Sequence, residues 1–384
     1  MGGAAVRVAT VITRLEGGAG QHALRGALIM DPAAYEMTII TGSGDPLLLG
    51  RAAAGGLEVL IEPALRAPIA PGSDLRALVR LRKLFGHRAF DVVHTHTAKA
   101  GVVGRLAAHA AGVPRLVHTY HGFPFHEFQG APRRRAYVRI ERWLGQITDL
   151  ALCVGTGVAV EAVRRQLISP ERIRTIGVVV EGLVACPDAR GRARAALGLP
   201  DEATVVGTVG RLTYQKAPED FLAALQALDR PGVTGVWVGD GELAGQIAAQ
   251  AREISPIRVL LTGQRADVPE LLPAFDVFVL SSRYEGLPTA VVEAMMCGIP
   301  VAATAVNSVG DVVVPGGTGL LVPPGHPALM AGAIGFLLDS PGVAARMAAA
   351  AQTWLGQRFG ETALRQALIA AYCGEGAAAW PRHG

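Results

Sequence analysis

The sequence predicts an α/β protein of two doubly wound, Rossmann-like domains, each a parallel sheet wrapped by helices. Short β-branched runs alternate with Ala- and Leu-rich stretches of helical spacing along almost the whole chain, a pattern typical of βαβ units. The runs are nearly continuous in apolar residues, as expected of strands buried on both faces. With 384 residues, the chain is long enough for two domains, each with its own core.

The first series of alternating elements fills the N-terminal half. Strands are predicted at residues 6–13, 36–41, 57–62, 91–97, 114–120, 149–155 and 172–180. Helices are predicted between them, most clearly at residues 74–85, 99–111, 133–145 and 158–166. Strand, helix and strand in this order favour a parallel sheet.

The pattern changes after Val180, where Gly, Pro and charged residues predict a linker near residues 181–187. We therefore expect one domain over residues 1–183 and a second over residues 184–357. In open α/β sheets ligands bind at the carboxyl ends of the strands, so two facing domains would place the site in a central cleft. Strands of the second series are predicted at residues 204–212, 235–241, 257–263, 276–282, 299–305 and 318–323.

The composition excludes several classes of protein. The net charge is +4, from 36 Lys and Arg against 32 Asp and Glu. This small excess of positive charge does not indicate a nucleic-acid-binding protein. The four cysteines are far apart and form no C-x-x-C pair, which disfavours structural zinc and a disulfide framework. The start lacks the pattern of a secretory signal, and no apolar run reaches the roughly 18 residues of a membrane helix. We expect a soluble, cytoplasmic protein.

The stretch SSRYEGLPTAVVEAMMCGIPVAAT, residues 281–304, carries the most chemical information. A strand is expected to end at Ser282, and Pro288 suits the first turn of the helix that follows. Gly298 suits the end of that helix. The free N–H groups at residues 286–289 would form an anion site at the helix N-terminus.

Two glutamates lie near this helix start. Glu285 comes just before it, and Glu293 lies about five residues into the helix, roughly 7–8 Å along it. A carboxylate at that depth could accept both hydroxyls of a ribose while a diphosphate rests on the helix N-terminus, as in dinucleotide folds. From spacing alone, two surface carboxylates are an equally good interpretation.

Charged and flexible residues also follow other strand ends. A strand-to-helix loop would aim Arg211 and Lys216 into the cleft, where two cations could neutralise a phosphate group; a solvated helix start is the alternative. Gly17, Gly18 and Gly20 follow the first strand, where glycines let the backbone approach a phosphate. A lone G-G-x-G segment is often only a tight turn.

Histidines gather around the predicted strands at residues 91–97 and 114–120. His121 ends a strand of the buried type and by position faces the cleft. The neighbours His94, His96, His118 and His126 raise the alternative of a metal site. His94 and His96 share one face of their strand, whereas His118 points to the opposite face if the register holds. The spacing therefore disfavours a metal cluster.

Four segments, taken in order, resemble the family 4 glycosyltransferases, retaining enzymes of the GT-B fold that use nucleotide sugars. The order and spacing agree with the family from about residue 6 to residue 324. The family usually has Gly after the lysine of the third segment, where this chain has Ala217 and Pro218. The segments are EGGAG (16–20), VHTYHGF (117–123), GRLTYQK (210–216) and EGLPTAVVE (285–293), the last continued by AMMCGIPVAATAVNSVGDVV.

The resemblance implies transfer of a sugar from a nucleoside diphosphate sugar, UDP-linked by family frequency, to a hydroxyl of a glycan, lipid-linked or small-molecule acceptor. It implies no metal and no cofactor. The acidic residues 240–242 are more typical of a turn and helix cap than of a metal site. The implied catalytic residues are His121, Arg211, Lys216 and Glu285. The implied donor-binding residues are Gly18, Gly210, Arg265, Gly286, Leu287, Pro288 and Glu293.

The acceptor is expected to bind to the first domain. By resemblance, the C-terminal helix within residues 358–384 packs back onto that domain. Arg133, Arg134 and Arg135 begin a basic helix, which is usually a solvated face. Contact with an anionic membrane, at its inner face, is the alternative. The expected acceptor loops surround His22, residues 47–52, Lys99 and residues 124–135.

Three other functions use similar sheets. A dehydrogenase needs G-x-G-x-x-G straight after a strand, which residues 17–20 do not supply. A nucleotide-sugar epimerase on the same fold would change its sugar without an acceptor. A non-catalytic nucleotide-sugar-binding module would usually have lost Glu285, Arg211 or Lys216, and this chain keeps all three.

Overall fold

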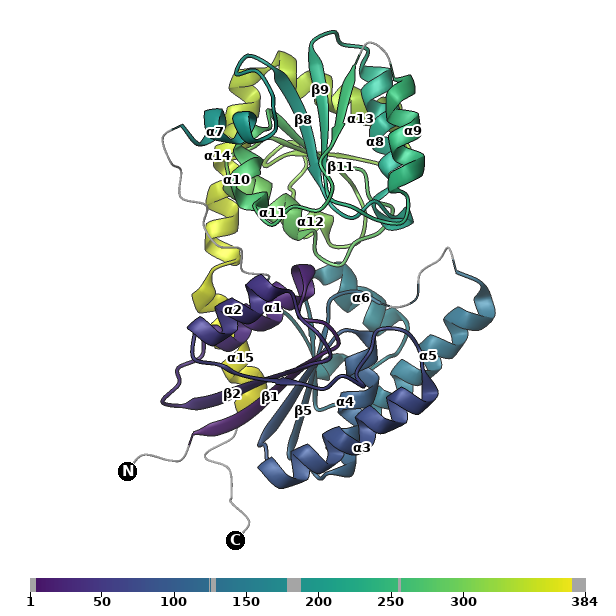
Figure 1. The fold of residues 1–384 in the computed structure, drawn as a ribbon, viewed down its shortest axis with the longest axis vertical. Helices are drawn as coiled ribbons and strands as arrows, with labels where there is room; N and C mark the ends of the chain where they lie inside the picture. The colour runs from purple at the N-terminus through teal and green to yellow at the C-terminus, as the bar shows by residue number, and fades with distance from the viewer. Residues whose placement is uncertain (1–4, 124, 126–128, 178–187, 255–256, 375–384) are drawn as a thin grey trace. The chain divides into compact units, whose positions relative to one another are not determined.

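The computed structural model describes residues 5–123, 125, 129–177, 188–254 and 257–374. The chain divides into two compact units (Figure 1), Met1–Val179 with Gly360–Gly384, and Val180–Phe359. Each unit contains an open, wholly parallel sheet with helices between its strands, so the predicted fold class is confirmed. The predicted linker at residues 181–187 and the predicted boundary at 183/184 lie outside the described residues.

The sheet of the N-terminal unit has seven strands in the order β3-β2-β1-β4-β5-β6-β7. The strands are β1 (Val6–Ile12), β2 (Tyr35–Thr41), β3 (Glu58–Ile61), β4 (Val92–His96), β5 (Arg115–Tyr120), β6 (Leu150–Cys153) and β7 (Ile173–Thr175). The helices are α1 (Gly17–Leu28), α2 (Pro46–Ala54), α3 (Pro71–Arg88), α4 (Ala98–Ala110), α5 (Ala131–Gln146), α6 (Thr156–Arg164) and α15 (Glu361–Cys373). The strand order reverses between β1 and β4, so this sheet has its switch point there.

Two apolar cores cover the two faces of this sheet. On one face, α1, α2 and α15 pack over side chains such as Val117. On the other face, α3 and α4 pack over side chains such as Val93. The helix α15 comes from the far end of the chain (Figure 1). Its Leu368 and Tyr372 are buried in the first core. The C-terminal segment therefore completes the N-terminal unit.

The sheet of the C-terminal unit has six strands in the order β10-β9-β8-β11-β12-β13. The strands are β8 (Thr204–Val209), β9 (Val233–Val238), β10 (Arg258–Leu261), β11 (Val277–Leu280), β12 (Val301–Thr304) and β13 (Leu320–Val322). The helices are α7 (Ala189–Ala196), α8 (Pro218–Leu228), α9 (Ala244–Glu253), α10 (Val268–Leu271), α11 (Thr289–Met296), α12 (Val309–Val312), α13 (Pro327–Asp339) and α14 (Pro341–Arg358). Here the order reverses between β8 and β11.

The structure differs from the sequence-based expectations at a few elements. The strand predicted at 172–180 is only the three residues of β7, and its last part lies outside the described residues. The stretch 47–52, expected as an acceptor loop, is inside α2, because the Asp45 side chain caps the Leu47 N–H at 2.8 Å and Pro46 takes the first turn.

The other expected acceptor loops are also largely helical. His22 lies in α1, and Lys99 lies in the first turn of α4. The stretch 124–135 falls partly outside the described residues and otherwise leads into α5. The expectation of loops at these positions is therefore wrong, whereas binding of the acceptor to the N-terminal unit stays a prediction.

A buried charged pair in the N-terminal unit was not predicted from sequence. Arg105 of α4 is fully buried, and its Nη2 donates to Glu141 Oε2 of α5 at 2.8 Å. Its Nε donates to the carbonyl of Gly101 at 2.7 Å. The Tyr120 hydroxyl donates to the same Glu141 oxygen at 3.0 Å. These bonds tie α4 and α5 to the end of β5, directly before His121.

We expect Glu141→Ala to lower the free energy of unfolding by about 3–5 kcal/mol, because the variant leaves the Arg105 charge buried without its partner. Urea denaturation followed by circular dichroism measures the change. The control is Glu58→Ala, since Glu58 pairs with Arg88 where both side chains are about 40% exposed, so solvent screens their attraction and a much smaller loss of stability is expected. Equal effects of the two substitutions would contradict the prediction.

Candidate active site

Two of the predicted site residues in the C-terminal unit form a direct ion pair at the switch point of the sheet. Lys216 lies in a short 3-10 turn after β8, and Glu285 lies in the loop after β11. The Lys216 Nζ atom is 2.6 Å from Glu285 Oε1, and the two side chains are 17% and 5% exposed. Residues 69 positions apart in the sequence thus share one largely buried contact.

Three uncharged side chains hold Glu285 in place. The Ser282 hydroxyl donates to Oε1, which also accepts from Lys216. The Gln215 amide nitrogen lies 3.4 Å from Oε2, a long contact. Asn307 Oδ1 accepts the backbone N–H of Glu285 at 3.0 Å. Sequence reasoning missed these residues, and the only signal for Gln215 and Ser282 is their place beside the recognised charges.

Arg283 fixes the segment that carries Lys216 against the loop that carries Glu285. Its backbone N–H donates to the Gln215 carbonyl at 2.8 Å, and its Nη1 donates to the Tyr214 carbonyl at 2.7 Å. The guanidinium lies 4.3 Å from the centre of the Tyr214 ring, within cation–π range. Its Nη2 donates to Glu219 Oε1 of α8 at 2.7 Å. Sequence reasoning gave Arg283 no role.

Gly210, before Lys216, and Ala217, after it, have backbone features that accommodate the lysine. A Cβ atom at Gly210 would lie 3.3 Å from Lys216 Cδ and Cε, so glycine lets the lysine stem run close to the backbone. Ala217 is fully buried with φ +47°, the left-handed conformation that favours the glycine usual in the resembling motif. Pro218 begins α8, as expected from its first-turn preference.

Arg211 is exposed beside the ion pair, directly after β8 and Gly210. Its guanidinium makes no hydrogen bond within the part of the chain that the structure describes. Burial raises the pKa of Tyr284, and the nearby Arg211 charge opposes that rise. Arg211 is therefore a cation close to the Glu285 loop that is available to an anionic ligand.

The helix α11 begins at Thr289, with Pro288 at its N-cap position rather than in the first turn. Its predicted end is confirmed, because Gly298 follows with φ +74°. The N–H groups of Gly286, Leu287 and Thr289 donate no hydrogen bond among the described residues. These groups precede or begin the helix, where an anion is stabilised.

Glu293 is the fifth residue of α11, as predicted. Burial raises the pKa of Glu293 to about 7, and the nearby Lys216 charge limits the rise. Its carboxyl group makes no hydrogen bond within the described residues. A partly buried acceptor without a partner is suited to ligand hydroxyl groups.

Two further predicted features have local partners. Arg265 follows β10 and binds Asp267 with both its Nε, at 2.7 Å from Oδ1, and its Nη2. Its guanidinium is therefore already paired. Asp240 lies in a turn, and its side chain accepts the Gly241 N–H at 2.7 Å. The expectation of a helix cap there is wrong, because the N-cap of α9 is Leu243.

In the N-terminal unit, the predicted glycines begin α1. Gly17 has φ +58°, and Gly18 lies in the first turn. A Cβ atom at Gly20 would lie 2.8 Å from the carbonyl carbon of Leu15. Gly20 is therefore needed for close packing of the helix on the strand-end loop, a structural reason that applies with or without a ligand.

His121 follows β5 and contacts other histidines on one face of the sheet. Its Nε2 lies 3.0 Å from Nδ1 of His96, the last residue of β4. The ring of His22, from α1, packs against His121 with the centres 5.3 Å apart. His118 points to the opposite face, where it bonds Thr95 at 2.8 Å, as the strand register predicted.

Hydrogen bonds to one another or to hydroxyl groups are made by His94, His96, His118 and His121. No group of three or more His, Cys, Asp and Glu is arranged to hold a metal ion among the described residues. Burial lowers the pKa of His22 to about 4 and that of His94 to about 3, and it lowers the pKa of His96 and His121 well below the usual range. All four rings are therefore neutral at pH 7.

The helix α5 presents a mixed basic and apolar face. Arg133, Arg135 and Arg139 are exposed, while Arg134 is only half-buried. Trp143 is 51% exposed on the same helix. Among the described residues, no single helix is long and apolar enough to cross a membrane. The segments Pro327–Asp339 and Pro341–Cys373 reach the required length and apolar character only when they are taken together, and the chain bends sharply between them.

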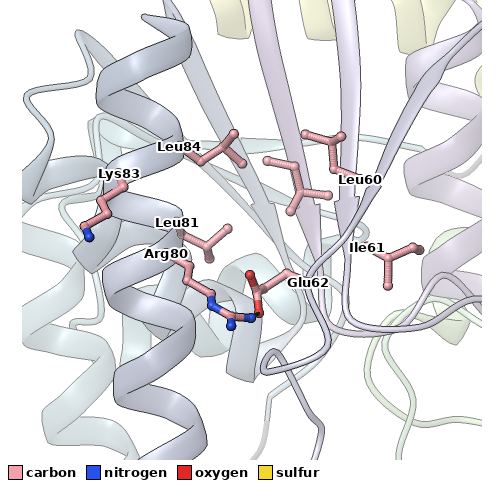
Figure 2. A pocket seen from close by; sticks show the side chains of 8 residues that line it. Leu60, Ile61, Glu62, Arg80, Leu81, Lys83 and Leu84 are labelled. Carbon is pink, nitrogen blue, oxygen red and sulfur yellow. Dashed lines mark hydrogen bonds and ion pairs between the residues drawn. The ribbon is translucent and has the colours of Figure 1, made fainter.

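A cavity of about 440 Å³ lies between the edge strand β3 and α3 (Figure 2). Arg80 and Glu62 point toward one another at its mouth, with Nη1 and Oε1 3.2 Å apart. None of the predicted site residues lines it. The lining residues are Ile40, Leu60, Ile61, Glu62, Arg80, Leu81, Lys83 and Leu84.

Comparisons with known proteins match both units. The family model "Glycosyltransferase Family 4" matches residues 16–180, and the model "Glycosyl transferases group 1" matches residues 189–354. One relative is a UDP-Gal:alpha-D-GlcNAc-diphosphoundecaprenol alpha-1,3-galactosyltransferase of Escherichia coli, which is 34% identical over 253 residues. The match covers 64% of this chain and 65% of the relative, so the chain spans slightly less than two thirds of that protein's length. A D-inositol 3-phosphate glycosyltransferase of Thermobispora bispora is 30% identical, over 78% of this chain and 74% of that protein.

Solved structures agree in fold. Anabaena HepE in complex with UDP and glucose has a TM-score of 0.83 at 22% identity, over 95% of this chain and 98% of that chain. WaaG, a glycosyltransferase involved in lipopolysaccharide biosynthesis, has a TM-score of 0.76 at 17% identity, over 96% of this chain and 100% of that chain. With its two parallel sheets and these matches, the chain belongs to the family 4 glycosyltransferases and has the GT-B fold.

Proposed function

We propose that this protein is a retaining glycosyltransferase that moves a sugar from a UDP-sugar to an acceptor hydroxyl. The observation that carries the proposal is the group of charges at the β8/β11 switch point: the Lys216–Glu285 pair, the exposed Arg211 and the free N–H groups that lead into α11. The UDP-Gal of the Escherichia coli relative's name and the UDP bound to HepE support UDP as the carrier.

The cations and the helix start suit a diphosphate leaving group. As the bond from the anomeric carbon to the β-phosphate oxygen breaks, negative charge grows on that oxygen. Arg211, Lys216 and the N–H groups of Gly286 and Leu287 are already in place to stabilise it, without reorganisation during the reaction. The acceptor oxygen bonds the anomeric carbon from the face that the diphosphate leaves, and its proton passes to the diphosphate.

The two glutamates take separate roles in this proposal. Glu285 Oε1 is occupied by Lys216 and Ser282, while Oε2 has only the long contact with Gln215. Oε2 is therefore the free acceptor for a hydroxyl of the donor sugar. Glu293 binds the two ribose hydroxyls, and the loop at Gly263 and Arg265 lies near the base. His121 forms a hydrogen bond with the donor sugar in this proposal.

The stereochemistry of the transfer and the absence of a metal are proposed on chemical grounds and not from a particular contact. The loops at the β8/β11 switch point offer positioned charges rather than an obvious protein nucleophile, which favours front-face attack with retention. We propose that no metal and no cofactor takes part, and the cytoplasmic location stays a prediction. An epimerase on this fold would convert its UDP-sugar without an acceptor, so an acceptor-free incubation separates the two activities.

The acceptor in this proposal is a glycan or lipid-linked hydroxyl presented at an anionic membrane surface. Arginines interleaved with the exposed Trp143 and Ile140 on α5 support membrane contact, since cations meet lipid phosphates while the aromatic ring enters the interface. The lipid-linked substrate in the name of the Escherichia coli relative is consistent with such a surface.

The first test is thermal unfolding with UDP, GDP, ADP, dTDP and NAD in turn. A ligand at about a thousand times its Kd adds roughly 4 kcal/mol, so we expect UDP to raise the Tm by several degrees, with and without EDTA. A shift with another diphosphate would correct the base. A shift with NAD alone, or none at all, would overturn the proposal.

The matched variants are Arg211→Ala and Arg252→Ala, since both arginines are exposed in the C-terminal unit. We expect Arg211→Ala to keep the ligand-free Tm, to lose most of the UDP shift and to lower turnover by about 10²–10³, the usual cost of one stabilising donor. Arg252→Ala should retain both. Normal turnover of Arg211→Ala would refute the assignment of this residue.

UDP affinity should depend on the protonation of Glu293. The ionised carboxylate accepts both ribose hydroxyls and the protonated group accepts fewer, so affinity should rise with pH through about 7, the pKa that burial gives this group. Calorimetry between pH 5.5 and 8.5 measures the profile. Glu293→Gln should weaken binding and remove this part of the pH dependence, leaving that of UDP itself. Identical profiles for the two proteins would count against the ribose role.

Membrane contact is tested by co-sedimentation at low salt with vesicles of phosphatidylcholine alone or mixed with phosphatidylglycerol. We expect binding only to the anionic vesicles, weakened roughly tenfold or more by Arg135→Glu with Arg139→Glu, since each basic residue contributes about 1 kcal/mol. The control pair is Arg252→Glu with Arg258→Glu, exposed arginines of the other unit. Absence of binding, or equal loss in the control, would remove the idea.

A further inference from the structure

Four histidine rings pack together where β4 and β5 end in the N-terminal unit. They come from three segments: His22 from α1, His94 and His96 from β4, and His121 after β5. The ring centres of His94 and His96 are 4.2 Å apart, and those of His96 and His121 are 5.3 Å apart. Only His121 was assigned a role by the sequence, so the other rings need an explanation.

His96 makes the one hydrogen bond that the His121 ring has among the described residues. The bond joins His96 Nδ1 and His121 Nε2 at 3.0 Å. Because it occupies Nε2, the Nδ1 atom is the ring nitrogen of His121 left for a ligand. His96 therefore decides which edge of the His121 ring is presented.

The pair also couples the protonation of the two rings. Burial, together with the neighbouring histidines, lowers the pKa of both residues well below the usual range, so each ring carries one proton. A bond between two neutral imidazoles needs one proton between them, on either His96 Nδ1 or His121 Nε2. The tautomer of His96 thus fixes the tautomer of His121, and with it whether Nδ1 donates or accepts.

The His96 ring packs against the His94 ring, whose own hydrogen bonds restrict its rotation. Both ring nitrogens of His94 are occupied, Nδ1 by the Tyr372 hydroxyl at 2.9 Å and Nε2 by the Thr119 hydroxyl at 2.7 Å. Tyr372 is on α15, buried against this face of the sheet. The His94 ring packs against His96 with the ring centres 4.2 Å apart and the planes tilted by 38°, and this contact limits rotation of the His96 side chain.

We propose that His96 is a positioning residue, which holds the His121 ring in one orientation and one tautomer so that Nδ1 meets the donor sugar. The role of His121 at the sugar rests on the proposed function. The restraint of the His121 ring by His96 does not depend on the proposed function, because it follows from the hydrogen bond between the two rings.

The test uses the full chain labelled with ¹⁵N-histidine and long-range ¹H–¹⁵N spectra at pH 7.5, with His121→Gln identifying the signals. In the unchanged protein we expect His121 to show one protonated and one bare nitrogen, with a nitrogen–nitrogen coupling from His96. Averaged signals from His121, or no coupling, would overturn the pairing without any variant.

The variants separate positioning from stability. His96→Leu should average the two His121 nitrogens, whereas His96→Asn, with an amide in place of Nδ1, should keep one tautomer. His118→Leu is the matched control, because His118 is equally buried but lies on the opposite face, and it should leave the His121 signals unchanged. A single His121 tautomer in His96→Leu would overturn the proposal.

Turnover distinguishes this proposal from the proposed function. With the donor found by the nucleotide panel, His96→Leu should lower kcat about 10–100-fold with KM within twofold, and His96→Asn should recover part of the loss. Full turnover in His96→Leu would overturn the positioning role. If no nucleotide sugar is used at all, the proposed function fails, while the spectra still decide whether His96 fixes His121.

Discussion

The contact between Lys216 and Glu285 is the interaction on which the C-terminal site depends. Parallel strands end at one edge of the sheet, so the loops after β8 and β11 meet there although they are far apart in sequence. The ion pair is largely buried, and such a pair is tolerated only when other bonds compensate its lost hydration. Ser282 bonds the Glu285 carboxylate, and Gln215 makes a longer contact with it. Arg283 instead bonds the backbone carbonyls of Tyr214 and Gln215 and so holds the segment before Lys216 in place.

The sequence predicted the sheets well because burial on both faces leaves a strong, nearly continuous apolar pattern in each strand. It placed Lys216 and Glu285 after strand ends and Glu293 inside the next helix, but only the resemblance to a known motif distinguished them from solvated surface charges. It could not predict Gln215 or Asn307, whose importance comes only from a neighbour distant in sequence. Arg105 shows the same limit, since an arginine on a helix is expected at the surface, and its burial depends on bonds to Glu141 and to the Gly101 carbonyl.

The two units carry different kinds of polar group at the carboxyl ends of their strands. The C-terminal unit uses charges, which suit a diphosphate. The N-terminal unit uses imidazoles that burial keeps neutral, so its polar groups act through hydrogen-bond direction rather than charge. Directional bonds of this kind can select the orientation of a hydroxyl group.

Lys216 also links the two carboxyl groups of the C-terminal site. It pairs directly with Glu285, and its charge lowers the pKa of Glu293 without cancelling the rise caused by burial. One ammonium group cannot neutralise two buried carboxylates, so the group without a hydrogen bond, Glu293, is the one that gains a proton near neutral pH. A diol that donates two hydrogen bonds to Glu293 would stabilise its charged form. Binding of such a ligand would therefore release the proton that Glu293 carries near neutral pH.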